Sequence, residues 1–266
     1  MMNFRGLARI PVACHAAFIL GLAGPAGATA LLGTAHSFSV LGASAVTNTG
    51  ATTLVGDLGV HPGNSIAGLG TITVVGTVHQ ADAVAQQAQS DAAAAVGMLN
   101  SQASTANLTG QNLGGLTLTP GVYDFASAAQ LTGTLVLDYQ NNANAVFVFR
   151  ILSALTTASS SVVSIINGSA NDGLFWRVGS SATLGSSSVF AGTVLAGQSI
   201  TLGAGAQIVC GRAIALRAAV TLDSNTVSTD CPPDAPNAGG GAVPEPALLA
   251  LTALALGSLA WARRRA

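Results

Sequence analysis

The sequence predicts a mainly β chain in which short strands wind into a solenoid of stacked coils, with one long α-helix packed alongside. Three observations support this prediction. A short phrase recurs about every 20 residues, only 7% of the residues are charged, and one Ala- and Gln-rich segment carries apolar residues at helical spacing. Few charges and many small residues favour closely packed strands over an ordinary helical enzyme.

The recurring phrase lies in the second half of the chain. Residues 199–202 (SITL) return as residues 219–222 (AVTL), and residues 181–184 (SATL) stand upstream. Such a repeat is typical of stacked β-coils, because a single coil cannot bury its apolar side alone. An ordinary β-sandwich with coincidentally similar strands is the alternative, and the stepwise register of the repeats favours the solenoid.

Alternation within each phrase separates the inside of the coil from the outside. We expect Leu155, Ala182, Ile200 and Val220 to form one column that points into the core. Their neighbours point outward, since successive side chains of a strand alternate between its two faces. One outward column is then Thr156, Thr183, Thr201 and Thr221, and the other is Ala154, Ser181, Ser199 and Ala219. The same pattern continues at Ala45 with Thr47 and, more weakly, at Ala128 with Gln130.

These outward columns predict a flat, uncharged grid of methyl and hydroxyl groups. Stacked coils place the Thr side chains about 4.8 Å apart, with the paired small residue about 6.7 Å away along the strand. A soluble surface rarely keeps so many small uncharged residues in register without a role. The alternative is strand propensity alone, because Thr and Ser are favoured on any exposed strand of a solenoid.

One segment departs from the β pattern. Residues 78–103 are rich in Ala and Gln and have apolar residues at 81, 84, 85, 88, 92, 95, 96 and 99. That spacing places them on one face of a helix. Ala at most of these positions lets the helix lie close along a side of the solenoid, while Gln and Asp occupy its other face. We therefore predict a supporting helix and not a membrane helix.

Both ends of the chain have the composition of targeting segments. Residues 1–30 combine two Arg, an apolar run and a small-residue site at 28–30 (ATA), which is the pattern of a secretory signal peptide cleaved after Ala30. Pro25 and three Gly interrupt the run and disfavour a membrane-spanning helix. The mature body then begins at residue 31, and a Pro- and Gly-rich linker over 232–242 follows it.

The last residues, 243–266, contain three parts in order. Residues 244–246 (PEP) precede an apolar run over 247–262 and three Arg at 263–265. The run spans roughly 24 Å as a helix, which is short for a membrane anchor. The three-part order resembles the PEP-CTERM sorting signal of Gram-negative bacteria. That resemblance implies transient membrane anchoring, recognition by an exosortase, removal of the tail, and delivery to the cell surface or the extracellular matrix.

The net charge argues against a nucleic-acid partner, and the cysteine content suggests a disulfide in an exported chain. Residues 31–242 hold four Arg and nine Asp, a net charge near −5, so we expect no nucleic-acid partner. Cys14 leaves with the signal peptide, and Cys210 and Cys231 remain. Their separation of about one coil in an exported chain predicts a disulfide that closes the open end of the solenoid. Two free, buried thiols are the alternative.

The residues that carry catalysis or bind metal are too scattered to suggest an enzyme. The four His, at 15, 36, 61 and 79, lack ligand spacing, so we expect no metal site and no cofactor. Residues 203–205 (GAG) follow a strand but lack the Lys and the helix of a phosphate loop. A carbohydrate lyase or hydrolase needs clustered carboxylates, whereas Asp223 and Arg217 are isolated. Asp57 is expected to hold a turn.

The features together resemble the bacterial and fungal ice-binding proteins built as a discontinuous right-handed β-solenoid with one long flanking helix. The likeness covers residues 33–231, and the matching phrases are residues 38–63, 112–125, 145–151, 173–196 and 210–227. The ice-contacting face of that family often carries a Thr-Ala/Gly-X-Thr/Asn phrase on successive coils. The corresponding stretches here, 180–183 (SSAT), 198–201 (QSIT) and 218–221 (AAVT), keep the final Thr and lack the leading one.

The resemblance implies a secreted or surface-delivered, non-enzymatic protein that adsorbs to ice through the outward columns. Its expected partners are an ice surface, an exosortase-type processing enzyme at the C-terminus, and exopolysaccharide. The alternative function is a structural or adhesive protein of the extracellular matrix, because such sorting tails often accompany exopolysaccharide production. Under either function we expect no catalytic residue.

Overall fold

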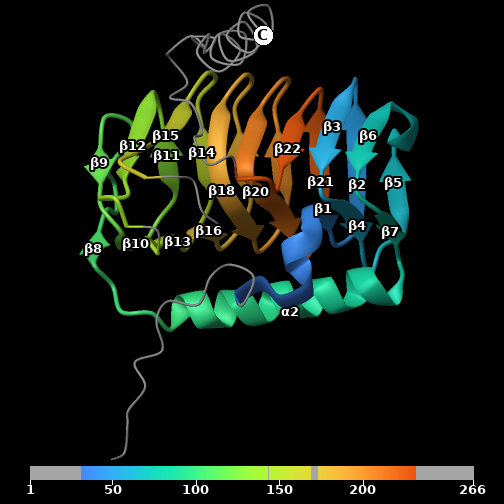
Figure 1. Cartoon of the computed structure of the whole chain (residues 1–266), viewed down its shortest axis with the longest axis horizontal. Coiled ribbons are helices and arrows are strands. Elements are labelled where there is room, and N and C mark those ends of the chain that lie inside the picture. Colours follow the sequence, from blue (N-terminus) through green and yellow to red (C-terminus); the bar gives the residue numbers. More distant parts are fainter. Residues whose placement is uncertain (1–30, 143, 169–172, 232–266) are drawn as a thin grey trace, which may run out of the picture.

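Three faces of parallel strands wind around an apolar interior, and one helix, α2 (Ala83–Asn100), lies along the outside (Figure 1). The structure is a computed structural model that describes residues 31–142, 144–168 and 173–231. The predicted signal peptide (1–30), linker (232–242) and sorting segment (243–266) lie outside the described residues.

The first face is a separate seven-stranded parallel sheet that carries the repeated phrases. Most of its strands are three residues long, and their middle residue points away from the core. In spatial order the strands are β11 (Ala129–Leu131), β14 (Leu155–Thr157), β17 (Ala182–Leu184), β19 (Ile200–Leu202), β21 (Val220–Asp223), β2 (Ala45–Thr49) and β5 (Ser65–Ala67).

The other two faces belong to one fifteen-stranded sheet that bends along its length. The long strands β18 (Val189–Ala196) and β20 (Gln207–Ala215) run through both faces, and their pairing shifts register between Ala191 and Thr193. Their first halves join the third face, and their second halves join the helix-covered face.

The remaining strands of the sheet divide accordingly. The third face holds β6 (Ile72–Val75), β3 (Thr52–Val55), β22 (Thr226–Ser228), β15 (Val162–Ile166), β12 (Thr134–Asp138) and β9 (Thr117–Leu118). The helix-covered face holds β7 (Val78–Gln80), β4 (Asp57–Val60), β1 (Phe38–Gly42), β16 (Leu174–Val178), β13 (Phe147–Ile151), β10 (Gly121–Phe125) and β8 (Ala106–Asn107). Two 3₁₀ turns, η1 (Gly33–Ser37) and η2 (Leu69–Thr71), complete the described elements.

The order of the coils in space differs from their order in the chain. In the seven-stranded sheet, β21 lies between β19 and β2. In the fifteen-stranded sheet, β22 lies between β20 and β3, and β1 lies between β20 and β4. The N-terminal coils therefore continue the stack that the C-terminal coils end, as the adjacent blue and orange strands of Figure 1 show. Helix α2 carries the chain back along the solenoid to β8, where the second group of coils begins.

The interior of the solenoid is filled by the inward side chains of all three faces. Aromatic rings on successive coils stack there: the ring centroids of Phe149 and Trp176 are 4.0 Å apart, and those of Trp176 and Phe190 are 4.7 Å apart. The buried Trp176 indole donates a hydrogen bond to the carbonyl oxygen of Ala191 at 2.9 Å. Each coil is thus held by contacts to its neighbours, as the repeat predicts.

Helix α2 packs on the helix-covered face through small side chains. Asp82 caps its N-terminus by accepting a hydrogen bond from the amide of Ala85 at 2.8 Å. The helix is shorter than the predicted span of 78–103, because Val78 pairs with Leu58 of β4 and residues 78–80 are a strand. Its buried residues are Ala85, Ala88, Ala92, Ala95 and Leu99, and they contact Phe38, Leu41, Val122, Val148, Phe175, Leu195 and Ile214 of the sheet.

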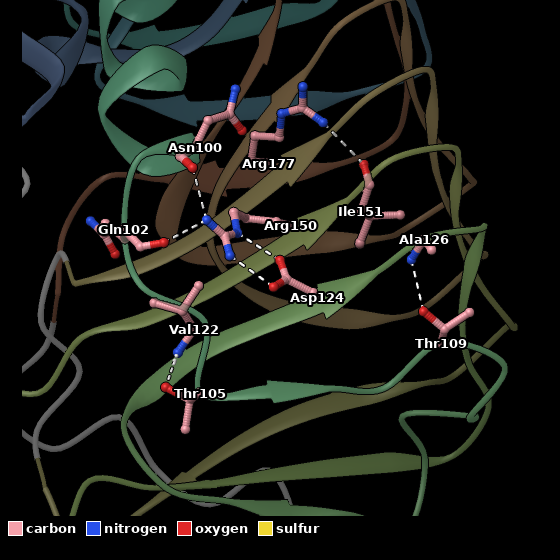
Figure 2. Close-up of polar contacts among 10 residues, drawn as sticks. All are labelled: Asn100, Gln102, Thr105, Thr109, Val122, Asp124, Ala126, Arg150, Ile151 and Arg177. Carbon is pink, nitrogen blue, oxygen red and sulfur yellow. Dashed lines mark hydrogen bonds and ion pairs between the residues drawn. The ribbon is translucent and has the colours of Figure 1, made fainter.

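The C-terminus of α2 is held by hydrogen bonds from Arg150, which also forms an ion pair with Asp124 (Figure 2). Arg150 Nη1 donates to the carbonyl oxygens of Asn100 and Gln102 at 2.9 and 2.8 Å. Its Nε and Nη2 bind both carboxylate oxygens of Asp124, at 2.6 and 2.8 Å. The guanidinium lowers the pKa of Asp124 through these hydrogen bonds, and its positive charge complements the negative end of the helix.

Cys210 and Cys231 form the predicted disulfide, with Cα atoms 4.4 Å apart. The prediction that it closes the open end of the solenoid is wrong. Cys210 belongs to β20 and Cys231 follows β22, and β22 pairs with both β20 and β3. Because the N-terminal coils stack beyond β22, the disulfide lies inside the stack and joins adjacent coils there.

Candidate functional site

The outward residues of the seven-stranded sheet, here called the Thr face, contain a column of five Thr side chains in register. Thr156 pairs with Thr183, Thr183 with Thr201, and Thr201 with Thr221. The column then crosses to the N-terminal coils, where Thr221 pairs with Thr47 although the two are 174 residues apart in the chain. Their hydroxyl oxygens are 3.2 Å apart, so the break in the chain does not interrupt the face.

A second column of small residues runs beside the Thr column. Backbone hydrogen bonds connect its members from coil to coil, from Ala128 to Ala219. The amides of the residues that follow Ala128, Ala154, Ser181 and Ser199 donate to the carbonyl oxygens of Ala154, Ser181, Ser199 and Ala219, respectively. The hydroxyl groups of Ser181 and Ser199 are hydrogen-bonded, with their oxygens 2.9 Å apart. In the N-terminal coils Ala45 holds the corresponding position and pairs with Ser65.

The structure brings all twelve predicted residues to this one face, seven within strands of the sheet and five directly before them. The members of the Thr column from 156 to 221 are exposed, and Thr47 is half-buried. The expected inward column is buried throughout, since Leu155, Ile200 and Val220 are fully inaccessible and Ala182 is 1% exposed. The full set is Ala45, Thr47, Ala128, Gln130, Ala154, Thr156, Ser181, Thr183, Ser199, Thr201, Ala219 and Thr221.

Both ends of the Thr column change chemistry. At one end Gln130 pairs with Thr156 and, through an isolated bridge, with Asn112. At the other end Ala67 of β5 pairs with Thr47. Asn112 and Ala67 were not among the predicted residues, because neither lies in a recognisable copy of the repeated phrase. The five Thr are therefore flanked by two amides on one side and a methyl group on the other.

The Thr face is electrically neutral in its centre. None of the twelve residues is charged, and the charged groups of these coils lie beside the columns: Asp223 ends β21 and Arg217 precedes it. Asp223 accepts a hydrogen bond from the Ser224 hydroxyl at 3.1 Å. The arrangement offers hydroxyl and methyl groups at fixed spacing and no fixed charge, which suits a neutral, ordered partner better than an ion.

The third face carries a less regular set of hydroxyl groups. Its outward positions in one register are Thr134, Val162, Val189, Gln207, Thr226, Thr53 and Thr73. Two Val and one Gln separate Thr134 from the other Thr side chains. The sequence did not predict this second series because its repeat is interrupted. It serves below as the control surface for the Thr face.

The described part of the chain offers little support for a metal-binding or catalytic role. Among those residues no group of three or more His, Cys, Asp or Glu could hold a metal ion. His79 Nδ1 lies 2.8 Å from Asp82 Oδ2, beside the cap of α2. Asp57 accepts a hydrogen bond from the amide of Thr77 at 2.8 Å and so ties adjacent coils together. The structure describes no helix long and apolar enough to cross a membrane.

Comparison with known proteins agrees with the geometry. A family model described as ice-binding-like matches residues 40–228, which is most of the chain. The chain belongs to the ice-binding-like family. This family is not enzymatic.

Individual members of the ice-binding-like family match along most of their length. An ice-binding protein of Nostoc sp. (strain HG1) is 52% identical over 206 residues, which are 77% of this chain and 76% of that protein. The crystal structure of an ice-binding protein from the Antarctic ascomycete Antarctomyces psychrotrophicus has a TM-score of 0.72 and 39% identity, over 76% of this chain and 98% of that one. A domain of Shewanella frigidimarina ice-binding protein 1 has a TM-score of 0.68 and 26% identity, over 77% and 97%. The predicted fold, a right-handed β-solenoid with a flanking helix, is confirmed.

Proposed function

We propose that this chain binds ice, and that it does so through the Thr face. Relatives that match most of the chain are named as ice-binding proteins, which supports the activity. The observation that carries the choice of face is the unbroken register of Thr156, Thr183, Thr201, Thr221 and Thr47 across the join between the two groups of coils. A face that stays in register across such a join is long and regular enough to match a crystal surface.

The physical basis of the proposal is the ordering of water. Hydroxyl groups at fixed spacing hold water molecules at fixed positions, and the methyl groups beside them leave those waters few other partners. A charged group would instead bind mobile water and counter-ions strongly. Affinity should therefore come from shape and from ordered water, and it should depend little on ionic strength.

The test of the proposal compares one substitution on the Thr face with one on the third face. Thr201→Tyr places a bulky ring at the centre of the Thr column, where it holds a flat ice surface away. We expect purified protein of residues 31–242 to inhibit ice recrystallisation, and Thr201→Tyr and Ser199→Tyr to lose most of that activity with unchanged circular dichroism.

Thr226→Tyr is the matched control, because Thr226 is an exposed strand residue on the third face. We expect this variant to keep the activity of the parent. Loss of activity in Thr226→Tyr with full activity in Thr201→Tyr would move the ice contact to the third face. An inactive parent protein would instead favour a structural or adhesive role in the extracellular matrix, with exopolysaccharide as partner.

We also propose that the chain is exported and that its tail is a sorting device. The proposal rests on the composition of residues 1–30 and on the order of the Pro-Glu-Pro box, apolar run and Arg cluster in residues 243–266. Mass spectrometry of the mature protein from its native host should show a chain that begins after Ala30 and has lost the residues beyond the box. A surface protein that keeps an intact Trp261 and Ala266 would contradict processing by an exosortase.

A further inference from the structure

A hollow of about 210 Å³ lies where α2 meets the C-terminal ends of β16, β18 and β20. Ala93 and Val96 of the helix line it on one side, and Leu216, after β20, lines it from the sheet. The backbone of Gly179 and Gly197 completes the lining. The hollow is distinct from the Thr face, and none of the residues of the two columns lines it.

Two arginines line this hollow. Arg177 comes from β16 and Arg217 follows β20, so they approach from strands on opposite sides of β18. Neither forms an ion pair with any residue that the structure describes, and the described lining residues include no carboxylate. Arg177 makes one long hydrogen bond, 3.5 Å from Nη1 to the carbonyl oxygen of Ile151.

Arg177 lacks the carboxylate partner that Arg150 has among the described residues. The two residues are paired on adjacent strands of the same face, and Arg150 binds both oxygens of Asp124. In Figure 2 the Arg177 guanidinium lies apart from that ion pair. Burial and the positive charge of Arg150 lower the pKa of Arg177. A half-buried guanidinium in a chain with few cations is thus left with its donors available, and an oxyanion would satisfy them in pairs.

We propose that this hollow, the Arg177–Arg217 pocket, binds an oxyanion: the carboxylate of an acidic sugar or free phosphate. Its volume is below the range of about 300–1,000 Å³ that is usual for drug-sized ligands, so the occupant is about the size of one sugar unit. The guanidinium groups bind the oxyanion by charge and by paired hydrogen bonds. Val96 and Leu216, which are half-buried, offer apolar groups for the C–H face of a sugar ring.

The test follows the amide signals of Gly197 and Leu216 in the ¹⁵N-labelled exported protein. The probes are D-glucuronate, inorganic phosphate and, as a neutral control, D-glucose. We expect saturable shifts with an oxyanion and none with glucose. Shifts with glucuronate but not phosphate assign an acidic sugar, and shifts with phosphate alone assign the free ion. Equal shifts with glucose, or none with either oxyanion, would overturn the proposal.

Two variants locate the binding. Arg177→Gln removes the charge and should weaken the oxyanion at least about tenfold, the usual effect of losing a charge-assisted hydrogen bond. Ala93→Glu keeps both arginines and adds a competing carboxylate at the rim, so it should weaken binding without disturbing the core. Ala94→Glu adds the same charge at an exposed helix position outside the lining and should bind as the parent does. Unchanged affinity in both Arg177→Gln and Ala93→Glu would place the oxyanion elsewhere.

Discussion

Arg150 holds together three parts of the molecule that are distant in sequence. Its guanidinium joins β13, the carboxylate of Asp124 on β10 and two carbonyl groups, those of Asn100 at the end of α2 and of Gln102 just beyond it. Only 13% of its side chain is exposed, so these hydrogen bonds are partly shielded from water. Among the described residues, Asp124 is the carboxylate that forms an ion pair with an arginine.

Arg150→Met is expected to lower the free energy of unfolding by about 2 kcal/mol. The variant keeps the apolar stem but leaves Asp124 and two carbonyl oxygens without their donor, and hydrogen bonds to charged groups contribute about 1.5–3 kcal/mol. Arg217→Met is the control, because Arg217 is exposed and its removal should change stability by less than about 0.5 kcal/mol. Equal urea midpoints for both variants would contradict this assignment.

Three carboxylates make the stability of the fold sensitive to acid. The pKa of Asp82 is lowered mainly by the amide of Ala85, that of Asp91 by the amide and hydroxyl of Thr34, and that of Asp124 by Arg150, all from an ordinary value of 3.8. A folded pKa below the unfolded one means that each carboxylate contributes stability above pH 3.8. That contribution is lost as the pH falls through the lowered values.

We therefore expect these groups to leave the free energy of unfolding unchanged between pH 7 and pH 5 and to decrease it below pH 4. Urea unfolding at pH 7, 5 and 3 measures the effect. In Asp91→Asn the titrating group is gone, so the decrease between pH 5 and pH 3 should be smaller than in the parent. An identical decrease in parent and variant would show that Asp91 does not contribute to it.

At the scale of elements, the close approach of α2 depends on its alanines. Ala85, Ala88, Ala92 and Ala95 are fully buried against the sheet, whereas Val84 is 46% exposed. The sequence pattern predicted these four alanines at the contact, but it also placed Ala81, which is exposed and precedes the helix, and Val84 on the buried face. Helical spacing alone defines a wide stripe, and the exact line of contact depends on the large side chains of the sheet beneath it.

Ala92→Leu should destabilise the protein by about 1–3 kcal/mol, because there is no space for the larger side chain between α2 and the sheet. Ala94→Leu makes the same change at an exposed position and should have little effect. Thermal unfolding of the two variants gives the comparison. A stable Ala92→Leu protein would mean that the helix shifts easily on this face.

The repeated phrases were sufficient to predict the coils of the second half and their inward and outward columns, but not Asn112 and Ala67 at the two ends of the Thr column. They were not sufficient to place the N-terminal coils. Residues 45–47 carry a recognisable copy of the phrase, but the pairing of Thr47 with Thr221 joins residues 174 positions apart. No local pattern reports such a contact. The same gap explains why the Cys210–Cys231 pairing was predicted correctly while its place in the stack was not.

At the scale of the whole molecule, the disulfide reinforces the join between the two groups of coils. It closes a loop of 21 residues that contains β21 and ends just beyond β22. A loop of that size contributes roughly 3 kcal/mol in the chain-entropy model.

Cys210→Ser/Cys231→Ser should therefore lower the free energy of unfolding by about that amount. Because β22 pairs with β3, we expect hydrogen exchange to become faster in Thr52–Val55 as well as in Thr226–Ser228. Non-reducing peptide mapping of the parent protein should recover the two cysteines in one linked peptide pair. Acceleration confined to the ends of the solenoid would contradict a join at this place.

The position of the last coil also decides when the chain can fold. While the ribosome is still making the second half, β2 and β3 have emerged but the strands that they pair with, β21 and β22, have not. Residues 38–80 then expose one side of their coils to solvent, and the nascent chain lacks the contacts that would close it. Contacts over such separations form slowly and late. The complete fold is therefore a property of the finished chain, and under the export proposed above, a chain that reaches a translocation channel before its final coil is synthesised arrives without the strands that join its two groups of coils.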